Sequence, residues 1–268
     1  MTRIAKKLEQ TQKEGRAALV SYIMAGDPNL ADSAKILDML PQAGVDMIEL
    51  GMPFTDPVAD GPVIQLAGQR AIAAGTNIDA IFHLVEDFRK KDNETPIILM
   101  GYYNPVHHYG QIRFLEKAKT IGIDGFIIVD LPLEEKEQFQ IPAQQMGLDF
   151  ISLITPATPN ERIAQIGNNA SGFLYYVSIT GVTGTKSAKQ SDLEAAIKRI
   201  KANCQLPIAI GFGINEPLKA KQAGKIANAV VVGSAIVGKI AQATEKPMDT
   251  VMQDVKSFVS SLSQALRD

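Results

Sequence analysis

Residues 18–50 read ALVSYIMAGDPNLADSAKILDMLPQAGVDMIEL, and this stretch holds the pattern that decides the fold. It opens with a continuously apolar, β-rich run at 18–24 and closes with a second run at 47–50. Between them lies an amphipathic segment, which starts after Asp27-Pro-Asn and stops at Gly44, as a capped helix does. Runs that stay apolar without alternation are typical of parallel strands covered on both faces. The stretch therefore predicts a strand, a helix and a second, parallel strand.

The same unit recurs along the whole chain. Further β-rich runs lie at 96–100, 125–129, 149–154, 172–177, 207–211 and 228–233, so the runs number eight. Helical patterns lie at 4–14, 30–44, 62–74, 79–91, 111–121, 134–146, 161–166, 192–201, 216–223, 235–240 and 247–267. Eight strands that alternate with helices predict an α/β fold, the (β/α)8 TIM barrel with a parallel eight-stranded sheet. The pattern at 4–14 adds an extra N-terminal helix. Since no linker interrupts residues 1–268, we expect a single barrel domain.

An open, doubly wound sheet is the alternative to the barrel. Such a sheet usually has fewer strands, and its first strand usually leads into a glycine-rich phosphate turn. Here the first run leads into Ala25-Gly-Asp-Pro28, and no GxGxxG motif follows it. The pattern therefore favours the barrel.

The composition excludes several functional classes. The chain has 268 residues, with 27 Lys and Arg against 29 Asp and Glu, for a net charge of -2. It lacks the basic excess of nucleic-acid binders, and it is richer in apolar residues than disordered chains are. Its apolar runs are too short to span a membrane, and its first residues lack the apolar core of a signal peptide. Because Cys204 is the single cysteine, we expect a cytoplasmic protein without an internal disulfide.

A carboxylate stands inside the second apolar run, where Glu49 lies between Ile48 and Leu50. Such a residue is unusual in a strand, because burying a charge is costly. Desolvation raises the pKa of a glutamate from about 4.3 toward neutrality, which suits a general acid or base. The alternative is a structural ion pair, but none of the eight runs contains Lys or Arg. The sequence therefore favours a catalytic role.

The loop after that run, residues 51–62, contributes two more carboxylates, Asp56 and Asp60. Asp60 precedes Gly61-Pro62 at a predicted helix start, so it is either the helix N-cap or a second catalytic carboxylate. In a barrel, the loops that follow the strands surround the active site. If this loop folds back over the barrel mouth, Asp60 and Glu49 face one substrate as an acid and a base in different environments.

Three glycine clusters lie in neighbouring loops near the end of the chain, at 181–184, 211–213 and 233–234. Glycines let a ligand approach backbone amides, and the N-terminus of a helix attracts anions. The loops after strands seven and eight of this barrel commonly hold phosphate. A single glycine often just ends a strand, but three clusters on neighbouring loops together favour a phosphate site, so we expect a small phosphorylated substrate.

Other groups give weaker signals. The adjacent His107 and His108 cannot easily aim both rings at one ion, and the remaining histidine, His83, lies in a predicted helix, so we expect no metal site. The strands offer no lysine for a Schiff base. Asp130 ends the fourth run, and it is either a substrate contact or a helix-entry residue.

Six segments carry a resemblance that spans nearly the whole chain. They are IELGMPFTDPVADGP at 48–62, MGYYNP at 100–105, VDLP at 129–132, GVTG at 181–184, GFGI at 211–214 and GSAIV at 233–237. Together they resemble the signatures of the tryptophan synthase alpha subunit family, and the first segment is the most specific. The resemblance implies a (β/α)8 barrel that acts as a lyase in L-tryptophan biosynthesis. Its reaction is the retro-aldol cleavage of indole-3-glycerol phosphate to indole and glyceraldehyde 3-phosphate.

The resemblance also implies a partner. In that family a beta subunit uses pyridoxal phosphate and receives the indole through a tunnel, and the two chains form an alpha2beta2 heterotetramer. The alpha chain itself carries no cofactor. The resemblance places the beta subunit against the loop that holds Pro53 and Asp56.

The roles known for the family transfer to individual positions of this chain. The catalytic roles fall on Glu49 and Asp60, with Glu49 protonating C3 of the indole ring and Asp60 stabilising the positive charge that results. The phosphate contacts fall on Gly184, Gly213, Gly233 and Ser234. The pocket contacts fall on Tyr22, Met100, Tyr102, Ile127, Val129, Tyr175 and Phe212, with Thr183 closing onto the site. Two positions depart from some members of the family, since Ile179 stands where they have Arg and Tyr22 where they have Phe.

Two other classes share part of the pattern. Another phosphosugar-binding barrel enzyme, an isomerase or decarboxylase of aromatic amino-acid or histidine biosynthesis, shares the phosphate end but does not need the long segment at 48–62. A non-catalytic barrel that only activates a partner does not need Glu49 and Asp60. The long segment and the two carboxylates together favour the lyase.

Overall fold

The structure is a computed structural model, and it describes residues 1–178, 190–211 and 213–268. Its strands are β1 Ala18–Met24, β2 Met47–Gly51, β3 Ile97–Gly101, β4 Gly125–Ile128, β5 Asp149–Phe150, β6 Ser152–Ile154, β7 Leu174–Val177, β8 Ile208–Gly211 and β9 Ala229–Val232. Its α-helices are α1 Arg3–Lys13, α2 Leu30–Gln42, α3 Pro62–Ala73, α4 Ile78–Arg89, α5 Tyr103–Tyr109, α6 Gln111–Ile121, α7 Gln140–Gln145, α8 Asn160–Gly167, α9 Gln190–Asn203, α10 Pro217–Gly224, α11 Ser234–Ile240 and α12 Met248–Arg267. Two 3-10 helices, η1 Leu133–Gln138 and η2 Ala241–Thr244, complete the described elements.

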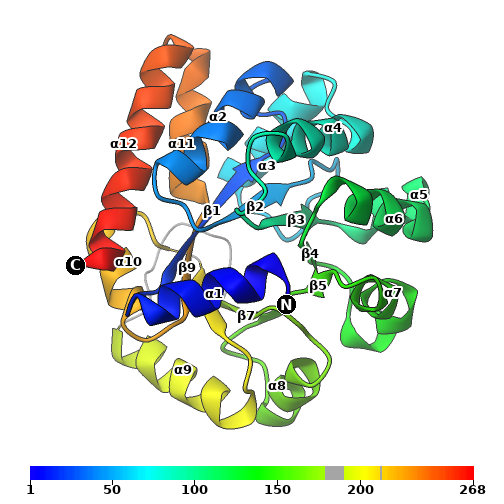
Figure 1. The fold of residues 1–268 in the computed structure, drawn as a ribbon, viewed down its shortest axis with the longest axis vertical. Coiled ribbons are helices and arrows are strands. Elements are labelled where there is room, and N and C mark those ends of the chain that lie inside the picture. Colours follow the sequence, from blue (N-terminus) through cyan, green and yellow to red (C-terminus); the bar gives the residue numbers. More distant parts are fainter. Residues whose placement is uncertain (179–189, 212) are drawn as a thin grey trace.

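The strands form one parallel sheet in the order β5-β4-β3-β2-β1-β9-β8-β7-β6. Its two outermost members, β5 and β6, are consecutive in the chain, so the sheet curls into a nearly closed barrel. Figure 1 shows the strands at the centre, with the helices arranged around them. The predicted fold class, a (β/α)8 barrel with an extra N-terminal helix, is confirmed.

The fifth predicted strand, 149–154, differs from the prediction because it is divided into β5 and β6. The first piece pairs with β4 and the second with β7, so the two pieces bond to different neighbours. Ile151 lies between them, and its amide donates to the carbonyl oxygen of Phe126 at 2.9 Å. The two pieces therefore occupy the place of one barrel strand whose hydrogen bonds change sides at Ile151.

Two helical segments also differ from the prediction. The pattern at 134–146 forms η1 and α7 rather than one helix, because the backbone of Phe139 is non-helical. The fully buried Phe139 ring packs 5.1 Å from that of Phe126, centroid to centroid. The unpredicted α5 has only seven residues, too few to show an amphipathic period. The other predicted helices and strands lie within two residues of the observed bounds.

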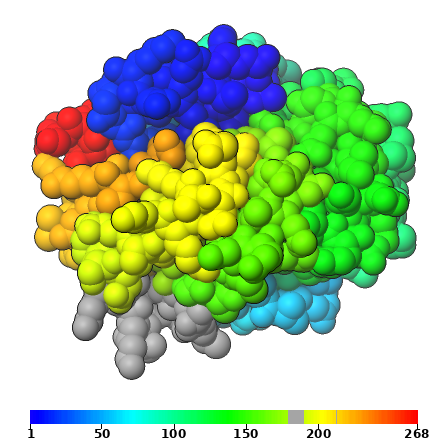
Figure 2. Space-filling view, turned by 90° about the horizontal axis from the view of Figure 1, so that it is seen from below, coloured from blue at the N-terminus to red at the C-terminus, as the bar shows by residue number. Residues whose placement is uncertain are grey.

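The barrel has two apolar layers because successive side chains of a strand point to opposite faces. On β1, Leu19 packs outward in the layer beneath the helices, whereas Val20 packs in the interior. The interior layer is closed at the N-terminal end of the strands by Ile4 and Leu8 of α1. In Figure 2, α1 (blue) lies along one end of the molecule. A light-blue segment, which the colour bar places near residue 60, protrudes at the opposite end.

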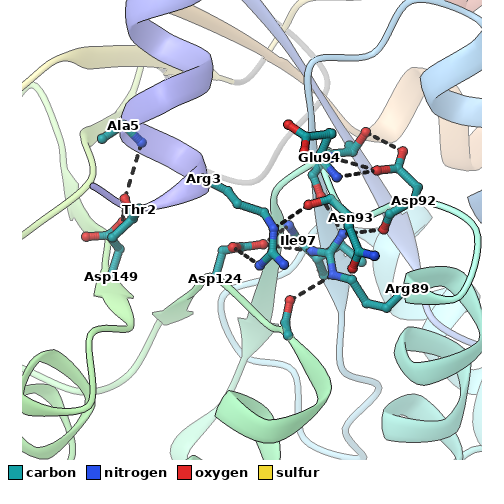
Figure 3. A network of polar contacts seen from close by, with 12 residues as sticks. Thr2, Arg3, Ala5, Arg89, Asp92, Asn93, Glu94, Ile97, Asp124 and Asp149 are labelled. Atoms are coloured by element: carbon teal, nitrogen blue, oxygen red, sulfur yellow. Dashed lines mark hydrogen bonds and ion pairs between the residues drawn. The ribbon is translucent and has the colours of Figure 1, made fainter.

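Polar contacts fix α1 across this closed end. Arg3 and Arg89 donate to the two carboxylate oxygens of Asp124, at 2.9 Å and 2.8 Å, and Thr2 donates to Asp149 at 2.7 Å (Figure 3). Both acceptors lie at the starts of strands, so the network lies at the opposite end from the loops that follow the strands. By the rule for this fold, that end contributes stability and the other end carries the active site. No helix in the described part of the chain is long and apolar enough to cross a membrane.

Candidate active site

Glu49 lies in β2 at the interior of the barrel, directly opposite Tyr22 of β1 in the pairing of the two strands. The side chain is buried, with 1% of its surface exposed. Among the described residues, its Oε1 atom has no hydrogen-bond partner. Burial raises the pKa of this carboxyl to about 8. Glu49 is therefore largely protonated at neutral pH, as a general acid must be before it acts.

Glycines at the ends of two strands make room for the tyrosines beside them. A Cβ atom added to Gly51 would lie 2.2 Å from the hydroxyl oxygen of Tyr22. A Cβ atom added to Gly211 would lie 2.1 Å from the hydroxyl oxygen of Tyr175. The two hydroxyls therefore occupy the space that a side chain at position 51 or 211 would need if the glycine were replaced. Glu49 contributes to raising the pKa of both tyrosines, after the larger effect of burial, so both lie near it.

Asp60 lies in the loop between β2 and α3, and its carboxyl is a second perturbed group. The N-cap of α3 is Gly61 rather than Asp60, so the N-cap interpretation of Asp60 is wrong. Burial raises the pKa of Asp60 to about 6, and a hydrogen bond from the Tyr102 hydroxyl offsets part of the rise. The same hydroxyl accepts the Ala59 amide hydrogen at 2.9 Å. Tyr102 thus holds both the main chain and the carboxyl of the Asp60 loop, a role that the sequence did not indicate.

The residues expected to line the pocket gather on the inner side of the barrel. Ile127 and Tyr175 belong to the interior apolar layer, and Met100 and Val129 pack against it. Tyr22 lies in a smaller cluster that Met100 also contacts. Two further expected contacts, Thr183 and Phe212, and the variant position Ile179 lie outside the described residues.

The expected phosphate end lies beside this pocket. Gly213 follows β8 in the left-handed region, with φ of 78°, where residues with side chains are strained. Gly233 is the N-cap of α11, and Ser234 is the first residue of that helix. The strands β8 and β9 pair with each other, so their loops adjoin, and the first amides of a helix have no partner within it. Gly184, the fourth expected contact, lies outside the described residues.

The loop that carries Asp60 is exposed on its outer side. Asp56 is exposed and accepts a hydrogen bond from its neighbour Thr55 at 2.6 Å, while Pro53 is half-buried. A groove of about 550 Å³ lies between this loop and α3. Val58 is 86% exposed and Leu66 is 54% exposed, which is unusual for large apolar side chains.

The remaining candidates from the sequence are Asp130 and the three histidines. Asp130 accepts the amide hydrogen of Tyr103, the first residue of α5, at 2.8 Å, so it holds the start of a helix that precedes its strand rather than the one that follows it. His107 and His108 are exposed on α5, and His83 bonds within α4. Within residues 1–178, 190–211 and 213–268, no three His, Cys, Asp or Glu side chains gather as metal ligands would.

The fold and the site together define a class. The molecule is a (β/α)8 barrel in which the carboxyls of Glu49 and Asp60, both of raised pKa, lie near the C-terminal end of the strands, where enzymes of this fold carry out their chemistry.

The comparisons with known proteins identify the family within that class. The family model described as tryptophan synthase alpha chain matches residues 8–267. A crystal structure of tryptophan synthase subunit alpha from Legionella pneumophila strain Paris is 40% identical, with 99% of this chain and 98% of that one covered and a TM-score of 0.92. A structure of Mycobacterium tuberculosis tryptophan synthase is 29% identical, with coverage of 100% and 99% and a TM-score of 0.89.

The chain belongs to the tryptophan synthase alpha chain family. The predicted activity is therefore confirmed: the protein is a lyase of tryptophan biosynthesis that cleaves indole-3-glycerol phosphate to indole and glyceraldehyde 3-phosphate. The family assignment also supports a chain that carries no cofactor of its own.

Proposed function

We propose that Glu49 and Asp60 are the catalytic residues of this cleavage. The observation that carries the proposal is the buried Glu49 carboxyl, which has an Oε1 atom without a partner among the described residues. A buried polar atom without a partner is costly to the fold, so its presence at the active end of the barrel favours a functional role. The raised pKa of the carboxyl supports the same role.

Glu49 would act first as an acid and then as a base. The bond between the indole ring and the glycerol chain breaks after C3 of the ring gains a proton, and the protonated Glu49 carboxyl supplies that proton. The resulting Glu49 carboxylate then removes the proton from the hydroxyl group next to the ring. The electron pair of that O–H bond forms the carbonyl of glyceraldehyde 3-phosphate. The pair of the breaking carbon–carbon bond returns to the indolenine ring, which neutralises its positive charge and gives indole.

Asp60 would stabilise the positive charge that forms on the ring. Protonation at C3 turns the indole into a cationic indolenine, with its charge centred on the ring nitrogen. An ionised carboxyl beside that nitrogen lowers the energy of the intermediate. Asp60 is ionised above a pKa of about 6, and the Tyr102 hydroxyl holds it in place. The two carboxyls thus differ in charge at neutral pH, with Glu49 neutral and Asp60 negative.

The rest of the site would bind the two ends of the substrate. For the indole ring we propose the apolar and aromatic wall of Tyr22, Met100, Tyr102, Ile127, Val129, Tyr175, Phe212 and Thr183, of which Phe212 and Thr183 lie outside the described residues. For the phosphate we propose Gly184, Gly213, Gly233 and Ser234. A Cβ atom on Gly233 would lie 3.3 Å from the Cβ atom of Tyr22, so the two proposed ends adjoin through Tyr22.

For the partner we propose a tryptophan synthase beta subunit that carries pyridoxal phosphate, in an alpha2beta2 heterotetramer. The whole-enzyme name of the similar Mycobacterium tuberculosis structure supports an assembly of this kind. The partner would dock on the loop with Pro53 and Asp56, where the groove and the exposed Val58 and Leu66 form an apolar surface. We also propose that residues 1–268 form a single domain in the cytoplasm, with the lone cysteine buried and free.

Release of indole from indole-3-glycerol phosphate by the purified chain tests the proposal. The assay is run with the unaltered chain, with Glu49→Gln and with Asp60→Asn, each alone and with a tryptophan synthase beta subunit. We expect activity in the unaltered chain and almost none in either variant. A variant that keeps most of the activity would remove its residue from the catalytic assignment.

A further inference from the structure

Helix α3 carries polar contacts at both of its ends. Near its C-terminal end, Arg70 donates two hydrogen bonds to Asp27 in the loop after β1, at 2.7 Å and 2.9 Å. Near its start, the side-chain amide of Gln65 donates to the main-chain oxygen of Asp60 at 2.9 Å, and it reaches the oxygen of Pro57 at 3.4 Å. One helix therefore joins a partly buried ion pair to the backbone of a proposed catalytic residue.

The Asp27 end of this connection is firmly fixed. Asp27 is 1% exposed, and both of its carboxylate oxygens are used by Arg70. The preceding Gly26 donates its amide hydrogen to Ser33 at 2.9 Å. It also lies so close to Thr76, just after α3, that an added Cβ atom would be 1.9 Å from the Thr76 hydroxyl. A two-fold contact between guanidinium and carboxylate fixes orientation as well as distance, so Arg70 restrains the rotation of α3 about its axis.

The other end of α3 determines where the Asp60 backbone lies. The helix begins at Pro62 with Gly61 as its N-cap, and no side chain caps this start. Only one residue separates Asp60 from the helix, so a small rotation or shift of α3 moves the Asp60 carboxyl as well. The Gln65 contact ties the two together directly, in addition to the Tyr102 hydroxyl contact with the neighbouring Ala59.

We propose that Gln65 and Arg70 are positioning residues for Asp60, an inference that rests on the proposed catalytic role of Asp60. Gln65 holds the Asp60 main chain, and Arg70, through Asp27, holds the helix that presents Gln65. Neither acts on the substrate in this scheme. Their contribution is to keep the Asp60 carboxylate at the place where positive charge develops, and a displacement of about 1 Å at such a site costs on the order of 100-fold in rate.

The test variant is Gln65→Leu, which keeps the size of the side chain but removes the donor. We expect kcat for indole release to fall about 10- to 100-fold, because positioning matters most as charge develops, while KM changes by less than about two-fold. The low-pH limb of kcat/KM should also move to lower pH, because a loosened Asp60 carboxyl becomes more solvated. Among the described residues, the titratable groups that face this carboxyl are the hydroxyls of Tyr22 and Tyr102, and both stay neutral across the range.

A second variant and a control complete the test. Arg70→Lys keeps the positive charge beside Asp27 but loses the two-fold contact, so it should give a smaller loss of the same kind. Combining it with Gln65→Leu should add little further loss, because both changes act through one helix. The control is Gln42→Leu, which removes a similar bond from a glutamine amide to a main-chain oxygen on α2. It should leave both kcat and the pH limb unchanged.

The outcomes separate this inference from the proposed function. Suppose that Gln65→Leu and Arg70→Lys both keep kcat and the low-pH limb of kcat/KM unchanged, while Asp60→Asn is nearly inactive. This result would overturn the positioning roles alone. Changes of similar size in kcat and KM, with no shift of the low-pH limb of kcat/KM, would also overturn the positioning roles, because general damage to the fold has this effect. Full activity in Asp60→Asn would instead overturn the proposed function. If Gln65→Leu does not fold, the same measurements on Arg70→Lys decide.

Discussion

Tyr22 and Glu49 lie directly opposite each other on two neighbouring parallel strands, with both side chains in the interior of the barrel. Residues in this relation point to the same side of a sheet, so both side chains project into the barrel interior, where Glu49 is 1% exposed. Exclusion of water is the cause of the raised pKa of Glu49. The place of Glu49 in the buried interior of the barrel thus determines the protonation state of the proposed catalytic acid.

Glu49→Gln should lower the rate of indole release about 100- to 10,000-fold, the usual cost of losing a general acid or base. The amide fills the same space, so KM should change little and the variant should fold. Steady-state kinetics and a thermal unfolding curve measure the two effects. Loss of folding together with activity would show that the carboxyl has a structural role.

The pH profile of kcat/KM should be bell-shaped. Asp60 must be ionised to stabilise the positive ring, so the rate falls as the pH drops through its pKa of about 6. Glu49 must be protonated to donate, so the rate falls as the pH rises through its pKa of about 8. Rates measured from pH 4 to pH 10 in Glu49→Asp and in the unaltered chain would show whether the high-pH limb belongs to this residue. If the high-pH limb of kcat/KM stays at the same pH in the variant, it belongs to another group than Glu49.

Glu49→Gln should also stabilise the fold, by a gain that grows as the pH rises above the unfolded pKa and is complete above pH 8. A glutamate with a pKa of about 8 in the folded chain and an ordinary value in the unfolded chain binds its proton more tightly when folded. The stability it contributes is therefore present below the unfolded pKa and is lost as the pH rises through the folded pKa. Since one pKa unit is worth about 1.4 kcal/mol, the variant should gain up to about 5 kcal/mol above pH 8 and almost nothing near pH 4.

Urea unfolding at pH 4.5, 7 and 9 measures this effect. The exposed Glu137 provides the control, since Glu137→Gln should change the free energy of unfolding little at any of these pH values. A gain of the same size at all three pH values would contradict the assignment of the raised pKa to Glu49.

Ser234→Asp should weaken binding of glyceraldehyde 3-phosphate sharply, because the new carboxylate lies beside the expected anion. Ser234 is exposed at the first position of α11, so the effect on stability should be small. Ser234→Ala is the matched control and should bind almost normally, because backbone amides provide most of the contact. Titration calorimetry with the phosphorylated product compares the three chains, and equal affinity in all of them would exclude this loop as the phosphate site.

Asp56→Ala should reduce activation by the beta subunit more than it reduces the basal rate. Asp56 is exposed on the outer side of the loop whose inner residue is Asp60, so it is placed to contact a partner rather than the substrate. Docking of the partner would order the loop and complete the site. The ratio of the rates with and without the beta subunit is the quantity to measure. An equal loss of both rates would show that Asp56 acts within the site itself.

The features that could be predicted are those that depend on residues close together in the sequence. Strands covered on both faces are continuously apolar, so their runs and the barrel could be predicted from local patterns, and the single charge within the second run drew attention to Glu49. The division of the fifth strand at Ile151 could not be predicted, because it depends on which neighbours bond to each half.

Long-range contacts account for the other differences. Helix α5 is short, and its first amide is held by Asp130 from the next strand's loop, so no local signal marks its start. Tyr102 was expected to line the pocket, but its hydroxyl also holds the loop at Ala59, a contact across 43 positions of sequence. The contacts of Gln65 depend on how the same loop folds back onto α3.

The closure of the barrel by α1 has a kinetic consequence. Ile4 and Leu8 fill the N-terminal end, and the interior above them is packed with side chains, so it is no channel. In the isolated chain, without the proposed beta subunit to receive the indole, substrate and both products must therefore pass at the C-terminal end of the strands. Whichever product lies nearer the mouth blocks the other, so release should follow a fixed order and the reverse reaction should show ordered addition. The product that leaves last should inhibit competitively against the substrate, and the product that leaves first should not.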